Sequence, residues 1–187
     1  MKHKMRFLIP ACCVTVIVAL IAANIDNYEK PIDATVNPAN GDIAVGYLNN
    51  KFGCFVVECF DSNGDFLFSK SYKGSNGTLY MQYAENQLMV YVSVQKQLYV
   101  YSRDGENISK YYDEASKQLF MADQHWKHWI GWKKRNGSLR FTVEQNEYVY
   151  QTNSIFQHIV GHGGCKIFIR DKDGIEKVVY QSGKKLA

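Results

Sequence analysis

This sequence lacks the motifs that mark common enzyme classes. It has no Gly-x-Ser-x-Gly nucleophile elbow, and the glycine-rich stretch Gly161–Gly164 does not continue into the Gly-Lys-Ser/Thr of a phosphate-binding loop. The acidic turns Asp61–Asp65 and Asp171–Gly174 lack the spaced oxygen ligands and the distant Glu of a calcium loop. We therefore expect no catalytic residue, no cofactor and no metal, and we expect that the protein is not an enzyme.

The histidines do not form a metal-binding pattern either. His125 and His128 are three residues apart, which suits neither a helical pair four apart nor two side chains on one face of a strand. His162 precedes Cys165 by three residues, but an apolar strand start is a poor place for an activated thiolate. We interpret these residues as surface or partly buried side chains.

The sequence has little excess charge of either sign. Lys and Arg number 22 and Asp and Glu 18, which gives a net charge of +4. Lys2, Lys4 and Arg6 precede an apolar run, and without these three the 19 remaining basic residues face 18 acidic ones. A chain this close to neutral has no basic footprint for phosphates, so we expect no nucleic-acid partner.

Cysteine is scarce outside that run. Cys54, Cys59 and Cys165 are an odd number at irregular spacing, which is not a disulfide framework. Cys54 and Cys59 fall in one expected strand, on opposite faces and about 16 Å apart, beyond the reach of a disulfide. Pairing of either with Cys165 stays open, although buried thiols are favoured. A domain that does not depend on disulfides is typical of bacterial envelope proteins.

The first 32 residues divide into three segments. Residues 1–6 are a basic flank that we expect to stay in the cytoplasm. Residues 7–23 are 17 apolar residues interrupted only by Thr15, a length between a signal-sequence core and a membrane span. We favour a transmembrane anchor, and a cleaved signal sequence is the alternative. Residues 24–32 are a polar stem. The remainder is then outside the cytoplasm on a single-pass membrane protein, or is secreted if cleavage occurs.

A strand–turn–strand unit dominates the rest of the chain. It occurs at Val57–Phe68, at Leu98–Ser109 and, less regularly, at Leu139–Tyr150. The expected turn residues recur at one interval of 41 (64 to 105, and 105 to 146) and are Gly64, Gly105 and Asn146. Gly and Asn are the residue types that tolerate positive φ in a hairpin turn. A period of about 40 residues with several short strands indicates propeller blades.

The spacing predicts a domain from 33 to 187, built of about three and a half to four units of short antiparallel strands. The clearest unit has strands near 78–83, 87–94, 97–102 and 107–112. In the third unit we expect a short helix near 114–123 and, by the repeat, a strand at Trp126–Trp132 in preference to a helix. The last unit, which ends in a hairpin at 165–180, is cut short.

These residues resemble the NHL/WD-like β-propeller repeats and the short membrane-anchored propeller-like proteins of Gram-positive bacteria. The turns Phe60–Gly64 and Tyr101–Gly105 carry the resemblance, which extends over about 33–180. It implies an all-β, propeller-like array of four-stranded units behind one N-terminal transmembrane helix. A small ring of four units, an open arc completed by a homodimer and a β-sandwich all stay open. Such repeats mostly bind partners, so the resemblance implies binding.

One stretch combines aromatic and cationic side chains in the way that suits lipid headgroups or an anionic envelope polymer. The candidate binding patch is Trp126, Lys127, His128, Trp129, Trp132, Lys133, Lys134 and Arg135. The competing interpretation is a set of core tryptophans beside a basic turn at 133–137.

The function predicted from these features is that of a membrane-anchored, extracytoplasmic binding module. Its partner would be another envelope protein or an anionic surface polymer. The alternative is a cell-envelope enzyme or enzyme accessory with a site on one propeller face.

Overall fold

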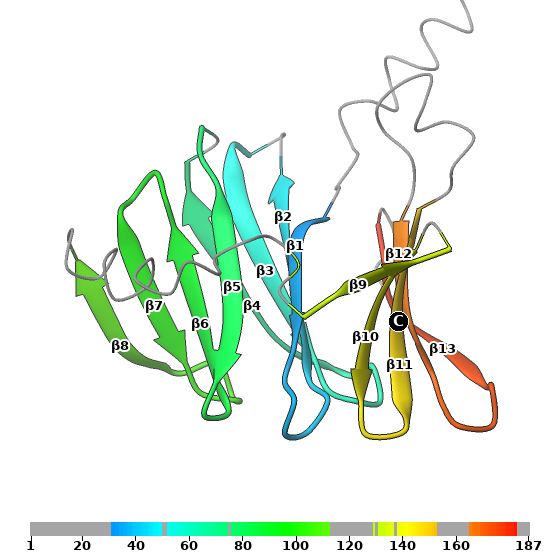
Figure 1. Cartoon of the computed structure of the whole chain (residues 1–187). Coiled ribbons are helices and arrows are strands. Elements are labelled where there is room, and N and C mark those ends of the chain that lie inside the picture. Colours follow the sequence, from blue (N-terminus) through cyan, green and yellow to red (C-terminus); the bar gives the residue numbers. More distant parts are fainter. Residues whose placement is uncertain are drawn as a thin grey trace, which may run out of the picture.

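The chain is described here from a computed structural model, which covers residues 31–49, 52–74, 76–112, 129, 131–136, 138–152 and 165–182. Within these ranges it forms antiparallel strands and no helix (Figure 1). The prediction of an all-β chain is therefore confirmed.

The strands form three sheets, each ordered along the chain. The first sheet contains β1 (Pro31–Val36), β2 (Ile43–Asn49), β3 (Cys54–Phe60) and β4 (Phe66–Lys73). The second contains β5 (Leu79–Ala84), β6 (Gln87–Val92), β7 (Gln97–Tyr101) and β8 (Asn107–Tyr112). The third contains β9 (Lys133–Arg135), β10 (Ser138–Val143), β11 (Asn146–Thr152), β12 (Cys165–Arg170) and β13 (Glu176–Gln181).

The β1–β4 sheet lies between the other two (Figure 1). One of its faces packs against β5–β8 through a cluster that includes Val57, Cys59 and Met81. Its other face packs against β9–β13 through a cluster that includes Val45, Tyr148 and Ile167. The third sheet thus contacts the first rather than the second, although it follows the second in sequence.

Burial on both faces explains the composition of the central strands. β3 reads Cys-Phe-Val-Val-Glu-Cys-Phe, a nearly continuous apolar run of the kind that a strand covered on both sides requires. Cys59 belongs to the cluster facing β5–β8, whereas Cys54 packs against the cluster facing β9–β13. The prediction that these two thiols point to opposite faces is confirmed.

Three hairpins share one turn built around a glycine with positive φ. Gly64, Gly105 and Gly174 have φ of 83°, 78° and 81°. Each glycine N–H donates to the carbonyl three residues earlier, and a side-chain oxygen of that earlier residue accepts a further N–H. The prediction that Gly64 and Gly105 are hairpin-turn residues with positive φ is therefore confirmed.

The prediction for the third repeat is wrong in its register. Asn146 is the first residue of β11, and the positive φ of the β10–β11 turn falls on Glu144. The true third copy of the turn is at Gly174. Gly64 and Gly105 lie in the last hairpin of their sheets, as Gly174 does in β12–β13, whereas β10–β11 is an inner hairpin of the third sheet. The predicted third and shortened units are one sheet, so the described residues form three units.

The segment before β9 also differs from expectation. Trp129 and Gly131 have φ of 64° and 83°, and the Trp132 N–H donates to the Trp129 carbonyl across 3.1 Å. This is a turn, so the predicted strand at 126–132 is wrong where the structure describes it. β1 begins at Pro31, two residues before the predicted domain start.

Several predictions concern residues outside the described ranges. These are the basic flank, the anchor and most of the stem, and the helix expected near 114–123. Among the residues that the structure does describe, none belongs to a helix of the length and apolarity that a membrane crossing needs.

One buried carboxylate joins all three sheets. Asp33 in β1 is 1% exposed. Its Oδ1 accepts the N–H of Ala34 at 3.0 Å and the N–H of Trp129 at 2.6 Å, and its Oδ2 accepts the N–H of Met81 at 2.9 Å. Met81 is in β5 and Trp129 precedes β9, so one side chain satisfies backbone donors from each neighbour of the central sheet.

Replacing Asp33 by Ala leaves these buried donors without their acceptor. At about 1–3 kcal/mol for each unsatisfied buried group, we expect D33A to lower the free energy of unfolding by at least about 2 kcal/mol in a denaturant titration. D104N, in an exposed turn, is the control and should change it by less than about 0.5 kcal/mol. Equal effects of the two substitutions would contradict this role for Asp33.

Asp33 also predicts a pH dependence of stability. Burial raises its pKa from 3.8 to about 7, and the three backbone hydrogen bonds oppose this only in part. The folded state therefore binds the proton more tightly than the unfolded state, and the stabilising contribution of Asp33 is lost as the pH rises from about 4 to about 7. The difference in free energy of unfolding between wild type and D33N should fall over that range and stay level above it.

Gly105 and Gly174 offer a matched pair of substitutions. A Cβ at Gly105 would lie 2.6 Å from Cγ of Phe68 in the neighbouring sheet, whereas a Cβ at Gly174 meets nothing within 4 Å. Both positions carry the backbone strain of positive φ, but only G105A also overpacks the contact between sheets. We expect thermal unfolding to show G105A less stable than G174A by about 1–3 kcal/mol. Equal losses of stability in the two variants would show that backbone strain alone, and not overpacking against Phe68, causes the destabilisation.

Candidate functional site

The two ends of the domain differ in charge. The lower end carries the turns that follow β1, β3, β5, β7, β10 and β12 (Figure 1). The carboxylates in these turns are Asp42, Asp61, Asp65, Glu85, Asp104, Glu106, Glu144, Asp171 and Asp173. Only Arg103 and Lys172 are basic there. The lower end is therefore acidic.

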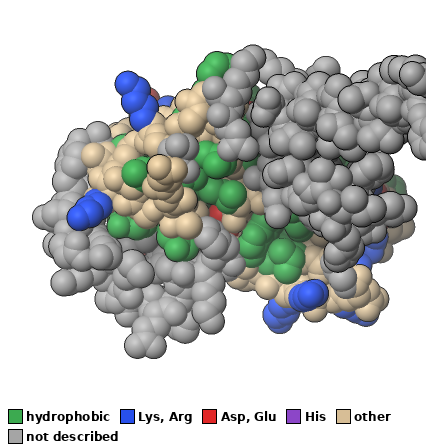
Figure 2. Space-filling view, turned by 90° about the horizontal axis from the view of Figure 1, so that it is seen from above, with side chains coloured by type: hydrophobic (Ala, Val, Ile, Leu, Met, Phe, Trp, Pro, Cys, Tyr) green, Lys and Arg blue, Asp and Glu red, His purple; other side chains and the backbone are tan. Residues whose placement is uncertain are grey.

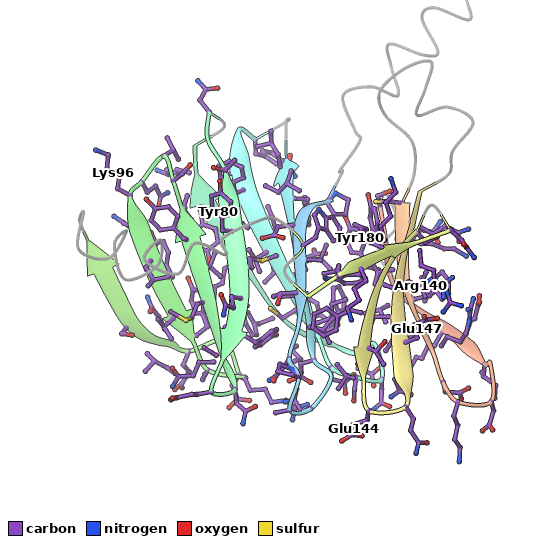
Figure 3. All side chains as sticks on the ribbon, in the orientation of Figure 1. Tyr80, Lys96, Arg140, Glu144, Glu147 and Tyr180 are labelled. Carbon is purple, nitrogen blue, oxygen red and sulfur yellow. The ribbon has the colours of Figure 1, made fainter. Side chains whose placement is uncertain are left out.

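The opposite, upper end carries the start of β1 and the turns that follow β2, β4, β6 and β9. Its described turns hold Lys73, Lys96 and Arg135 at their margins and no carboxylate. Figure 2 views this end and shows Lys and Arg side chains around its rim, with almost no acidic side chain in view. Figure 3 marks the contrast with Lys96 at the upper end and Glu144 at the lower end.

Side chains at the lower end tie the sheets together. Asp42, 1% exposed, accepts from Arg103 Nε at 2.7 Å and from Arg103 Nη2 at 3.1 Å. Asn37 Nδ2 donates to Asn86 Oδ1 at 3.3 Å, and the Tyr148 hydroxyl donates to the Gly41 carbonyl. Because they join the first sheet to both of its neighbours, these groups serve the fold.

The lower end also has a shallow hollow of about 520 Å³ between two turns of the third sheet. It is lined by Glu144, Gln145, Asn146, Asp171, Lys172 and Asp173. Asp171 Oδ1 is occupied by the N–H groups of Asp173 and Ile175, at 2.9 and 2.8 Å. Over the ranges that can be searched, no three His, Cys, Asp or Glu side chains converge as metal ligands. We assign no ligand to this hollow.

The structure separates the members of the predicted patch that it describes. Trp132 is 9% exposed, packs in the core between the first and third sheets and donates from Nε1 to the Ala34 carbonyl at 3.1 Å. Trp129 packs against the same core and lies 4.4 Å, centroid to centroid, from the Tyr150 ring. Lys133, Lys134 and Arg135 instead form β9, and all three are exposed.

The remaining members of the patch, Trp126, Lys127 and His128, lie outside the described residues. β9 pairs with β10 alone, so it is an edge strand of its sheet in the part of the chain that is described. The two described tryptophans thus anchor the strand that carries the cations. Sequence reasoning did not foresee Asp33, whose isolated position in a strand gives no motif signal.

Other arginines are neutralised on the outward face of the third sheet. Arg140 pairs with Glu147 at 2.5 Å (Figure 3). Arg170 pairs with Glu147 at 3.5 Å and with Glu176 at 2.6 Å. This ladder crosses four strands, β10 to β13. The cations of β9 have no such partner among the described residues.

The described groups with strongly raised pKa values lie within the packed domain. Burial raises the pKa of the Cys59 thiol, to which the side chain of Tyr83 is hydrogen-bonded, and burial likewise raises the pKa of Tyr83. Burial also raises the pKa of Tyr72, whose hydroxyl bonds that of Tyr101 at 3.0 Å, and that of Tyr148. The pairs Cys59–Tyr83 and Tyr72–Tyr101 lie between the first and second sheets rather than in an open cleft. Their raised pKa values therefore result from packing and do not mark an activated nucleophile.

Comparisons with known proteins add little. No family model matches the chain, and no curated protein matches it. A solved structure with some likeness is Hsv2 of Kluyveromyces lactis, at 14% identity and a TM-score of 0.31, over 82% of this chain and 63% of that one. A TM-score this low does not establish a shared fold. The described residues define the class by themselves: they form an all-β structure of three stacked antiparallel sheets.

The burial of Cys59 predicts low reactivity. Cys59 is fully buried with a raised thiol pKa, whereas Cys54 is only partly buried. Because the thiolate is the reactive form and needs access, we expect iodoacetamide to modify Cys54 at least about tenfold faster than Cys59 in the native protein. Peptide mass spectrometry resolves the two sites, and unfolding in urea should equalise them. Comparable native rates would place Cys59 at an accessible position.

Proposed function

We propose that this protein is a membrane-anchored binding module that works outside the cytoplasm and binds an anionic polymer of the cell surface. Residues 7–23 are the anchor, and residues 31–182 belong to the exported domain. The observation that carries the proposal is β9. It presents Lys133, Lys134 and Arg135 in succession, exposed and without an ion-pair partner in the described part of the chain.

Electrostatics favours this strand over the other cations. Arg103, Arg140 and Arg170 each have a carboxylate within 2.7 Å, so their charge is already compensated. Three consecutive strand residues span about 7 Å from first to last, so their cations can act together on neighbouring phosphates of one polyanion. Trp129 and Trp132 hold the strand on the core, which limits the conformational entropy lost when a ligand binds.

We also propose that the three sheets are blades of a propeller-like architecture. Each sheet has consecutive antiparallel strands, and the last sheet packs on the first, as it does where an array closes on itself. Three described sheets in the spatial order second, first, third form an open arc. Completion by a second copy of the chain, as a homodimer, stays a prediction.

The enzyme alternative has less support. An enzyme site brings several titratable groups with perturbed pKa values into one cleft. In the residues described, Asp33, Cys59 and Tyr72 have shifted pKa values but are enclosed by sheets.

The test is binding of the full chain, held in nanodiscs of zwitterionic lipid, to poly(glycerol phosphate). We expect K133S/K134S/R135S to weaken binding at least about tenfold, since each cation near a polyanionic surface contributes about 1 kcal/mol. The control K166S/K172S/K177S removes the same charge from β12–β13 of the same sheet and should change the Kd less than about twofold. Unchanged binding in the first variant, or equal losses in both, would refute the proposal.

A further inference from the structure

The upper end of the domain carries a second surface of mixed character, which we call the upper-turn patch. It consists of Phe52 and Val94, with 71% and 44% of their surfaces exposed, and of the exposed Lys73 and Lys96. Exposed apolar side chains rimmed by polar ones are a feature of surfaces that contact membranes. Neither residue belongs to any of the core clusters.

Two hydrogen bonds and one close contact join the turns that carry these four residues. The N–H of Gly74 donates to the Gly53 carbonyl at 3.2 Å, which joins the turn of Phe52 to the end of β4. Gln95 Nε2 donates to the Lys73 carbonyl at 2.7 Å, which joins β4 to the turn of Val94 and Lys96. A Cβ on Gly74 would lie 2.5 Å from the Val94 side chain, so these two turns are in contact. The upper-turn patch is therefore one preformed surface.

Its chemistry suits the interface of a bilayer. Aromatic and aliphatic side chains enter the boundary between headgroups and acyl chains, while lysines keep their ammonium groups among the phosphates. Anionic lipids attract such lysines, and carboxylates on the same surface would oppose that attraction. The described turns at this end contain no carboxylate, whereas the lower end holds nine.

The path of the chain brings this end to the membrane. β1 begins at Pro31 at the upper end, and only residues 24–30 separate it from the apolar run that ends at Ala23. Seven residues reach at most about 25 Å when fully extended. The strands that lead to the lower end have up to 8 residues and add roughly 26 Å. The tether therefore keeps the upper end close to the headgroups, whereas the lower end reaches them only when the tether is almost fully extended.

We infer that the upper-turn patch docks on the anionic lipid surface of the membrane that anchors the chain, with Phe52 and Val94 at the headgroup boundary and Lys73 and Lys96 on lipid phosphates. This inference rests on the proposed membrane anchor but not on polymer binding by β9. Docking orients the domain, so that the acidic lower end points away from the anionic surface.

Hydrogen exchange of the full chain tests the docking. The chain is placed in nanodiscs of phosphatidylcholine alone or of phosphatidylcholine mixed with phosphatidylglycerol. In the anionic discs we expect amide exchange in peptides covering Phe52–Gly53 and Ser93–Lys96 to slow at least about threefold. Peptides covering Asp61–Asp65 and Ser102–Glu106 at the lower end should exchange equally in both discs.

Two pairs of variants isolate the contact. F52S/V94S and K73N/K96N should each abolish the slowing, and Asn is chosen because it tolerates the φ of 51° at Lys96. The controls I108S/I175S and K172N/K177N replace exposed apolar and basic side chains away from the patch. In these controls the anionic discs should still slow exchange in the upper turns.

The outcomes distinguish the membrane anchor from the docking of the upper-turn patch. If the chain stays in the discs but its upper turns exchange equally in both lipids, docking is refuted and the anchor stands. If the slowing appears at the lower turns, the orientation is refuted. If an alkaline wash strips the chain from the discs, the anchor fails, and the docking that rests on it fails as well.

Discussion

The carboxylate of Asp33 is the interaction on which the arrangement of the sheets depends. It is buried in β1, an edge strand of the central sheet, and accepts backbone N–H groups from that strand, from β5 and from the turn before β9. Apolar packing alone is non-directional and would let stacked sheets slide. An acceptor shared by three segments fixes their relative positions, and its burial raises its pKa because desolvation disfavours the charged form.

The described turns of the three sheets lie at the two ends of the domain, and their carboxylates gather at the lower end. Strand after strand runs between the ends, so acidic turns and basic turns become separated by the full length of the strands. In the described part of the chain, acidic and basic turns therefore lie at opposite ends. The two surfaces to which we assign ligands, β9 and the upper-turn patch, both carry cations left unopposed by this separation.

The third repeat is where sequence periodicity predicts the wrong turn. Gly64 and Gly105 were predictable as turns because only residues tolerant of positive φ fit there. Asn146 falls at the same interval and is also tolerant, yet it begins a strand, while Gly174 forms the third turn. Hairpins within one sheet share the same apolar alternation, so the interval of 41 alone does not tell an inner hairpin from the last one. The turn residue does: the last hairpin of each sheet has a glycine with positive φ, whereas the β10–β11 turn has Glu144 there.

The sequence by itself determined the all-β class and most strand positions, because alternation and turn chemistry are local properties. For the same reason it determined the opposite directions of Cys54 and Cys59 and the cluster of cations at Lys133–Arg135. Tertiary structure alone decided which sheet packs on which, because contacts between sheets join residues far apart in the chain. It also decided that Trp129 and Trp132 face the core, that Asp33 joins three sheets and that Phe52 and Val94 meet Lys73 and Lys96 on one surface.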